Sequence, residues 1–256
     1  MDVVLEILIQ LVQMAILFGM AGLAVSWALL KNHNPRFAVL AGAVTVALYM
    51  GALFTLAVST QKQDVVAGLQ NSFDQVWKIK AQSMADLKAT PAEIENEQRI
   101  FQKYVFLALP AWMAVTCLTL GLLAYYLVSF FLARITQRVA GPIPFRGWVV
   151  PEYLVFGLIV GGMLKVMSKE NSLVDIVGNN FLVFFGCLYT LGGLSIVSFF
   201  LKKWFLSPGL RTLSYVVIFS YIVTLQQLFN PICLIGILDV WFDFRRLNAP
   251  PPEPAT

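Results

Sequence analysis

A group of polar residues inside one long apolar run is the first candidate for chemistry in this sequence. Asp175, Asn179 and Asn180 form a DxxxNN motif near the start of the run 173–201. A helix would place Asp175 and Asn179 one turn apart on a single face, where a carboxylate and an amide could bind a cation or a polar solute. The same side chains could instead lie at the level of the lipid headgroups or form hydrogen bonds between helices.

A second polar cluster lies directly before a proline in the last apolar stretch, 210–244. It consists of Gln226, Gln227 and Asn230, which is followed by Pro231. Asn230 suits a helix N-cap, and Pro231 suits the first helical position, where a missing N–H costs nothing. A helix that stops and restarts here would free backbone carbonyls to line a cavity, so this cluster is the second candidate solute-binding site. Hydrogen bonding between helices is again the alternative.

Two carboxylates near the C-terminus, Asp239 and Asp243, are four residues apart in the segment LDVWFDFRR and could form an acid/base pair. Arg245 and Arg246 follow at once, and the surrounding aromatic residues are typical of a membrane interface. We therefore predict a structural role. Asp243 is expected to pair with Arg246, and the two arginines to close an exposed end of the final helix.

The sequence lacks the common catalytic and metal-binding motifs. It has no P-loop, HExxH or GxSxG pattern, so an enzyme is the least supported class of function. The three cysteines lie in apolar runs without C-x-x-C spacing, and the single histidine, His33, cannot build a His-rich site. We expect no metal and no cofactor. Because no nucleotide-binding motif is present, active transport would need a separate ATPase or an ion gradient.

The composition indicates which elements must hold these residues. The 256 residues are 59% hydrophobic and only 12% charged, whereas about 25% is usual for soluble domains. A helix needs about 20 apolar residues to cross a bilayer. We predict an all-α, polytopic transmembrane helix bundle whose long apolar segments are 3–30, 37–59, 104–133, 149–167, 173–201 and 210–244. The break at Asn230-Pro231 leaves six or seven crossings open.

Glycines in these runs indicate close approach of helices. Gly157 and Gly161 form a GxxxG motif, and Gly192 and Gly193 are adjacent in a later run. Small residues let the backbones of neighbouring membrane helices come together. We read these glycines as packing positions rather than as parts of a site.

Basic residues in the short loops indicate the orientation. The loops 31–36, 134–150 and 202–211 carry Lys and Arg but no acidic residue, which predicts that they are cytoplasmic and that the N-terminus is outside. Such short clusters are topology signals, so the lipid bilayer is an expected partner and nucleic acid is not. No Lys or Arg precedes the first run, so we do not expect a cleaved signal peptide.

The segment 60–103 is the one part that looks soluble. It carries six basic and six acidic residues, and apolar residues at three- and four-residue spacing predict an amphipathic helix. Thr90-Pro91-Ala92-Glu93 predicts a capping box that starts a second helix, which should continue into the next span with a kink at Pro110. We expect an extracytoplasmic helical hairpin here, as a lid, a docking surface or a plain connection. Residues 1–247 would form a single transmembrane domain, and 248–256 a disordered tail.

The C-terminal half resembles a known family. The segments PFRGWVVPEYL at 144–154, GCLYTLGGLSIVSFFL at 186–201 and above all LIGILDVWFDFRRL at 234–247 resemble the YybS-like bacterial membrane proteins, domain of unknown function 2232. The resemblance covers about residues 60–247. It implies a location in the bacterial cytoplasmic (inner) membrane. It also implies a distant relation to the S components of energy-coupling-factor vitamin transporters, without an established activity. The matched residues where the family's function would be sought are Phe145, Arg146, Trp148, Pro151, Asp239, Trp241, Asp243 and Arg245.

Two classes of function remain. The first is small-solute binding or transport, in a cavity lined by both polar clusters. The second is a non-transporting scaffold or assembly protein that holds a membrane protein partner. A closed pocket containing both clusters would favour the first. Polar side chains engaged in helix contacts, together with an exposed apolar face on the hairpin, would favour the second.

Overall fold

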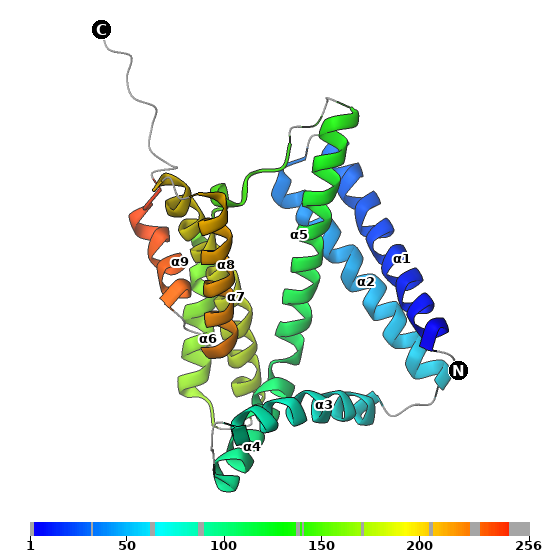
Figure 1. Ribbon diagram of the computed structural model, residues 1–256, viewed down its shortest axis with the longest axis vertical. Helices are drawn as coiled ribbons and strands as arrows, with labels where there is room; N and C mark the ends of the chain where they lie inside the picture. The colour runs from blue at the N-terminus through cyan, green and yellow to red at the C-terminus, as the bar shows by residue number, and fades with distance from the viewer. Residues whose placement is uncertain are drawn as a thin grey trace. The chain divides into compact units, whose positions relative to one another are not determined.

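The computed structural model describes residues 3–31, 33–61, 65–86, 90–136, 139, 141–169, 172–204, 207–225 and 231–245. Within these ranges every regular element is helical, which confirms the predicted all-α class (Figure 1). The chain folds into two compact units, residues 1–142 and 143–256. The single transmembrane domain that the sequence predicted stays a prediction.

Three long helices form the core of the first unit: α1 (Val3–Leu30), α2 (Pro35–Gln61) and α5 (Leu109–Ile135). Each packs against the other two. Helices α2 and α5 approach closely at Gly121, where an added Cβ would lie 2.6 Å from the backbone nitrogen of Ala43 and 2.8 Å from the carbonyl oxygen of Val39. Large apolar side chains such as Leu23 and Leu48 are exposed on the outer surface of these helices, as lipid-facing residues are.

The segment between α2 and α5 forms two helices, α3 (Val65–Asp86) and α4 (Pro91–Leu107). The predicted capping box is present: the Glu93 N–H donates to Thr90 Oγ1 at 3.3 Å, and the Thr90 N–H donates to Glu93 Oε2 at 2.8 Å. Phe73 and Trp77 of α3 are buried against Phe101 of α4, with ring centroids 5.2 and 5.8 Å apart. The two helices of the hairpin are therefore confirmed, whereas its position outside the membrane stays a prediction.

The junction of α4 and α5 corrects one prediction. We expected one continuous helix with a kink at Pro110, but α4 ends at Leu107 and α5 begins at Leu109. Proline has no N–H for the carbonyl four residues earlier, and its ring crowds that carbonyl, so the helix is interrupted instead of bent. The Trp112 N–H donates to the Ala108 carbonyl at 3.0 Å and restarts the helical pattern.

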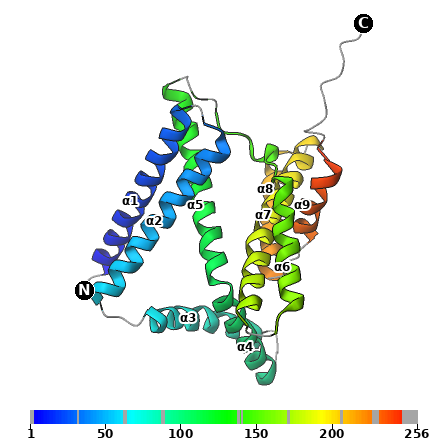
Figure 2. The ribbon, with the colours of Figure 1, turned by 180° about the vertical axis from the view of Figure 1, so that it is seen from behind.

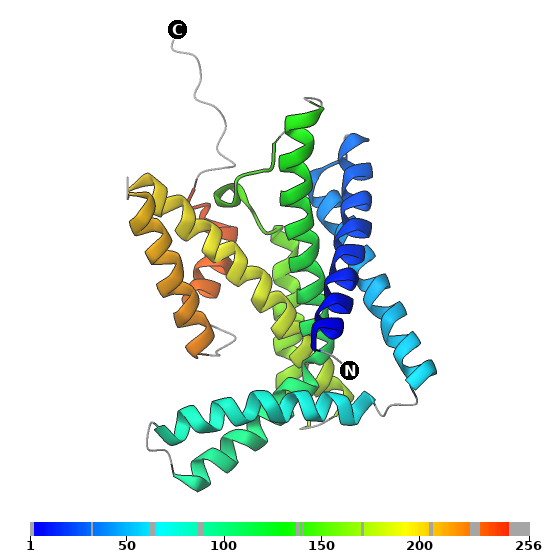
Figure 3. The same cartoon turned by 45° about the vertical axis from the view of Figure 1, so that its right-hand side comes forward.

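The second unit is built around the 31-residue helix α7 (Leu173–Lys203). Figure 2 shows α6 (Val155–Met167) beside α7, and α9 (Pro231–Phe242) packs on the other half of α7. The remaining helix, α8 (Pro208–Leu225), follows α7 in the chain and diverges from it in Figure 3. Tyr215 Oη of α8 donates to Ser198 Oγ of α7 at 2.8 Å.

Glycines bring the helices of this unit close together, as the sequence predicted. An added Cβ at Gly178 of α7 would lie 3.0 Å from the Gly161 carbonyl oxygen of α6. Gly193 of α7 faces the backbone of Ile232 in α9, and an added Cβ at Gly236 of α9 would lie 2.8 Å from the backbone nitrogen of Gly193. The α7–α9 contact is therefore backbone against backbone.

The predicted apolar segments in this unit differ from the helices. The run 149–167 was expected to be one span, but a short 3₁₀ turn, Glu152–Leu154, precedes α6, which has only 13 residues. Pro151 imposes an extended conformation on the residue before it, which delays the start of the helix. In the final stretch, α9 begins at Pro231, where the sequence predicted a helix start, and the described part of α8 ends at Leu225. Residues 226–230, including Asn230, lie outside the described residues.

Four helical segments of the described chain are long and apolar enough to cross a membrane: Leu8–Leu30, Pro35–Leu56, Leu109–Ile135 and Leu173–Lys203. The predicted six or seven crossings also required α6, α8 and α9. At about 1.5 Å per residue, the 13 residues of α6 and the 12 of α9 rise less than the roughly 30 Å of a hydrocarbon core. Four candidate spans are therefore supported, and the higher count stays a prediction.

Candidate functional site

The residues of the C-terminal motif and of the 144–154 loop converge on the guanidinium of Arg245. Its Nη2 donates to Asp239 Oδ2 at 2.7 Å. Its Nη1 lies 2.9 Å from the carbonyl oxygens of both Arg146 and Trp148, and 2.7 Å from Ser195 Oγ of α7. We call Arg245, Asp239, Ser195 and these loop carbonyls the Arg245 cluster.

Ser195 connects α7 to the same loop. Its hydroxyl donates to the Phe145 carbonyl oxygen at 2.8 Å, while its oxygen accepts from Arg245. Ser195 is fully buried, and the side chain of Arg245 is only 1% exposed. A buried guanidinium is strongly stabilised by a carboxylate and by polar acceptors, so this arrangement fixes the loop, α7 and the end of α9 together.

Asp239 also terminates α9. Its Oδ1 accepts from the Phe244 N–H at 3.0 Å, and its backbone carbonyl accepts from the Asp243 N–H at 3.1 Å. Asp243 has a φ of 38°, in the left-handed region that often follows the last turn of a helix and that aspartate tolerates. This turn directs the chain back, so that Arg245 lies against the loop and α7.

These contacts correct part of the predicted helix cap. A local ion pair exists, but it joins Asp239 to Arg245, and Arg245 is buried instead of lying at an exposed helix end. The turn at Asp243 is the physical reason, because helical spacing no longer applies beyond it. The expected partner of Asp243, Arg246, lies outside the described residues.

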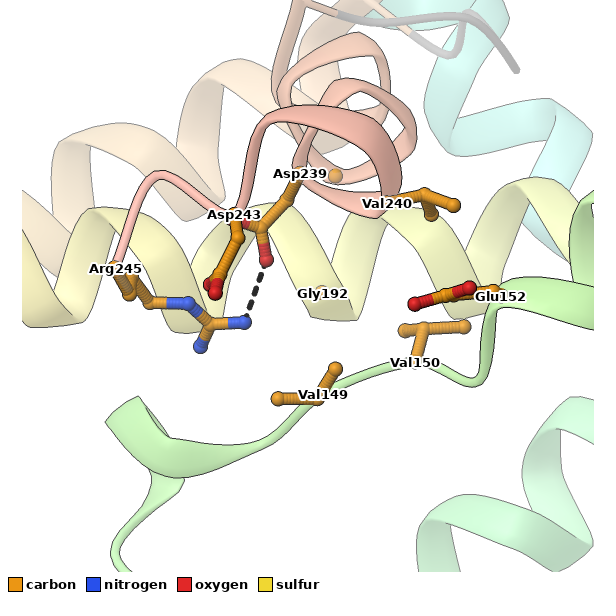
Figure 4. A pocket seen from close by; sticks show the side chains of 9 residues that line it. Val149, Val150, Glu152, Gly192, Asp239, Val240, Asp243 and Arg245 are labelled. Carbon is orange, nitrogen blue, oxygen red and sulfur yellow. Dashed lines mark hydrogen bonds and ion pairs between the residues drawn. The ribbon is translucent and has the colours of Figure 1, made fainter. Parts of the chain in front are cut away.

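A small cavity lies beside the Arg245 cluster (Figure 4). Three carboxylates, those of Glu152, Asp239 and Asp243, line it together with Arg245 and with backbone at Gly192 and Gly236. Its volume is about 20 Å³. Since one water molecule needs about 10–15 Å³ on this measure, the cavity can hold a water molecule but not an organic solute.

The first predicted polar cluster forms a second, separate set of contacts. Lys165 of α6 donates to Asp175 Oδ1 at 2.5 Å, and Ser168 Oγ lies 3.4 Å from the same oxygen. The Asp175 N–H donates to Ser172 Oγ, which caps α7. Asp175 is 4% exposed and Lys165 35% exposed, so only the lysine reaches the surface of the protein.

The two asparagines of this motif differ. Asn180 Nδ2 donates to the Ile176 carbonyl oxygen of its own helix at 2.8 Å. Asn179 is buried, and its Nδ2 has no hydrogen-bond partner among the residues that the structure describes. Neither asparagine lines the cavity beside Arg245, and the second predicted cluster, Gln226, Gln227 and Asn230, lies outside the described residues.

Sequence reasoning missed three participants in these sites. Ser195 and Lys165 were not singled out, because a serine inside an apolar helix and a lysine at a loop have many ordinary explanations. Gly236 was also missed, although its packing against Gly193 is what brings α9 onto α7. Conversely, Trp241 of the motif is exposed and takes no part in the Arg245 cluster.

The described residues contain no group of three or more His, Cys, Asp or Glu arranged to hold a metal ion. The Arg245 guanidinium forms an ion pair with the Asp239 carboxylate and compensates its charge, as Figure 4 shows. The chemistry that the site supports is therefore hydrogen bonding and charge pairing within the protein.

The fold and this site define an all-helical membrane protein with four candidate spans. The family model described as "Predicted membrane protein (DUF2232)" matches residues 2–240, so the chain belongs to this family, as the resemblance indicated. The match includes the first two helices, which the sequence resemblance had left out, and it ends before Asp243 and Arg245. No curated protein and no solved structure matches the chain.

Proposed function

We propose that the chain is a non-transporting membrane scaffold or assembly protein that holds a protein partner. The supporting observation is that charged and amide side chains of the second unit form hydrogen bonds and ion pairs within and between its helices. Arg245 joins α9, α7 and the loop, Asp175 pairs with Lys165, and Asn180 bonds within α7. A solute-binding chamber would need such groups to point into an open space.

The size of the cavity supports the same proposal. Sites for drug-sized or vitamin-sized molecules have volumes of roughly 300–1,000 Å³, lined by apolar and aromatic groups with a few polar ones. The cavity beside Arg245, at about 20 Å³, is far below that range. It gives no support to an S-component-like vitamin site among the residues of the second unit that the structure describes.

The hairpin does not distinguish the scaffold function from the solute-binding function. Val76 and Ile79 are exposed on α3, which meets the other condition set for a partner-binding protein. A lipid surface can also cover such residues, so their exposure is not specific to a protein partner. The proposal therefore rests on the polar residues.

Small-solute binding remains a second candidate because of one observation. Within the described part of the chain, Asn179 Nδ2 and Arg245 Nε are buried donors without a hydrogen-bond partner. Such donors are costly unless something accepts from them. A ligand at Asn179 would satisfy one of them. Asn180, whose amide is engaged within its own helix, provides the matched control.

Native mass spectrometry of the full-length protein, released from lipid nanodiscs, distinguishes the two functions. On the scaffold proposal, the spectrum contains the chain with a protein partner and no bound small molecule. A small-molecule adduct that is retained by wild type and Asn180→Leu, but lost in Asn179→Leu, would overturn the scaffold proposal. Circular dichroism of each variant confirms that the helices are intact.

A partner should also contact defined loops. Arg36 and Lys203 are exposed at the helix ends where the basic loops lie. A photo-crosslinking amino acid at either position should give a discrete crosslinked protein in cells, whereas one at the lipid-exposed Leu48 should not. Equal crosslinking at all three positions would mean that the contacts are non-specific and would contradict the proposal.

A further inference from the structure

We propose that α3 is an interfacial helix that lies along the bilayer surface and inserts Val76 and Ile79 among the lipids. The proposal concerns the first unit alone, and it does not depend on whether the protein is a scaffold or binds a solute. Its ligand is the lipid surface itself.

The apolar face of α3 is wider than its partner α4 covers. Phe73 and Trp77 are buried against α4, but Val76 is 55% exposed and Ile79 is 74% exposed. At about 100° per residue, Ile79, Val76 and Trp77 span an arc of about 160° around the helix. One edge of that arc packs on α4, and the other edge, at Val76 and Ile79, is open in the structure.

The opposite side of α3 is suited to water. Asp74 and Lys78 are both exposed and lie on the far side of the helix from Val76. A helix with a polar face and an apolar face lies in the plane of a membrane interface, with its apolar side in the headgroup and upper acyl region. Lys80 lies within the apolar arc, about 40° from Val76 on the side of α4. Its ammonium lies over the rings of Trp77 and Phe101 and 3.4 Å from Glu97.

The ends of the hairpin are held at the membrane by candidate spans. Three residues separate the end of α2 at Gln61 from the start of α3 at Val65, a link that can extend no more than about 14 Å. A single residue separates α4 from α5. Within the first unit, α3 runs crosswise to α1, α2 and α5 (Figures 1 and 3). A helix tethered in this way has its open apolar edge next to the bilayer.

A lipid surface fits the open edge better than a protein does. Specific protein interfaces bury about 800 Å² on each partner, which two side chains cannot supply. A tethered helix is already at the membrane, so it does not lose the translational freedom that a separate partner would lose. The charged residues of α3 are two aspartates and two lysines, so insertion should be driven by apolar contact and not by anionic lipid.

The test places a genetically encoded fluorescent amino acid at Ile79 in the full-length protein, reconstituted in phosphatidylcholine vesicles. The same amino acid at Lys78, the adjacent position about 100° around the helix, is the control. We expect the probe at Ile79 to be quenched several-fold more by lipids carrying a nitroxide on the upper acyl chain than by aqueous iodide. The probe at Lys78 should show the reverse preference.

Three outcomes would overturn the proposal. The probe at Ile79 could be quenched by iodide as strongly as the probe at Lys78, which would place α3 in water. It could be shielded from both quenchers, which would mean that protein covers it. Alternatively, the lipid quenching could appear only when phosphatidylglycerol is added, which would make the contact electrostatic. Replacement of Ile79 should not affect folding, because its side chain is already mostly exposed.

Discussion

The Lys165–Asp175 and Arg245–Asp239 ion pairs of the second unit are built from the same kinds of group but differ in whether the cation can reach solvent. In the Lys165–Asp175 pair the aspartate is buried, but the lysine is about one-third exposed. In the Arg245–Asp239 pair both side chains are more than nine-tenths buried. A lysine can extend its ammonium to the surface when its partner is lost, whereas a buried guanidinium stays buried with an uncompensated charge. The two pairs should therefore contribute very differently to stability.

Arg245→Met gives the largest expected effect. The substitution leaves the Asp239 carboxylate and the loop carbonyls buried without their donor, and breaking a buried pair costs about 3–5 kcal/mol. We expect a large fall in membrane expression and in the melting temperature in detergent. In Arg245→Met/Asp239→Leu the loss should be smaller than the sum of the single losses, because no unpaired charge remains. Additive losses would mean that the two residues act independently.

Gly193→Val tests the helix contact on which the Arg245 cluster depends. The new side chain would meet the backbone of Ile232 in α9, which cannot move aside as a side chain can, so we expect a loss at the upper end of the usual range of about 1–3 kcal/mol for overpacking. Gly162→Val, on α6, is the matched control, because nothing lies within 4 Å of an added Cβ there. Similar melting temperatures for the two variants would contradict the close α7–α9 contact.

Asp175→Asn should cost much less than Asp239→Asn. The first variant leaves Lys165, which is partly exposed and can move to the surface, so we expect less than about 1 kcal/mol. The second leaves Arg245 buried without a charged partner and should cost several times more. Thermal unfolding of both variants in the same detergent measures the difference. Equal losses of stability in the two variants would contradict the proposed difference between the two ion pairs.

The capping box of α4 is an exposed polar contact, and its loss should have a smaller effect than the loss of either ion pair. Hydrogen bonds from the backbone and then the side chain of Thr90 lower the pKa of Glu93 from its ordinary value of 4.5. A lowered pKa means that the stabilisation is complete above pH 4.5 and is lost as the pH falls through the folded-state value. Helicity should therefore decrease slightly below pH 4.5 in wild type, and less in Thr90→Ala. The same acid response in both would argue against the cap.

The local signals of the sequence identified many of the elements correctly. Thr90 and Glu93 predicted a helix start because a capping box needs only residues three apart, and Pro231 predicted the start of α9 because its ring suits only the first turn. The long apolar runs predicted α1, α2, α5 and α7, because the thickness of a bilayer sets a length that can be counted. These predictions succeeded because each physical cause is contained within a few turns of chain.

The partners of Arg245 depend on long-range packing that no local spacing contains. The carbonyl of Arg146 is 99 residues away in the sequence, and Ser195 is 50 residues away. Helical spacing predicted that Asp243 would pair with Arg246, but the left-handed turn at Asp243 ends the helix and redirects Arg245 inward. Only the tertiary structure shows that turn, together with the backbone contact of Gly193 and Ile232 that brings the three segments together.

The sequence by itself thus determined that the chain is a helical membrane protein, where several helices begin and which family it resembles. Those properties follow from composition, run length and caps. The tertiary structure decided which charges are buried, because burial depends on the approach of helices that are distant in sequence. It also decided that the family-motif residues Phe145, Arg146, Trp148, Asp239 and Arg245 form one cluster, since a buried guanidinium is stable only where several acceptors converge on it.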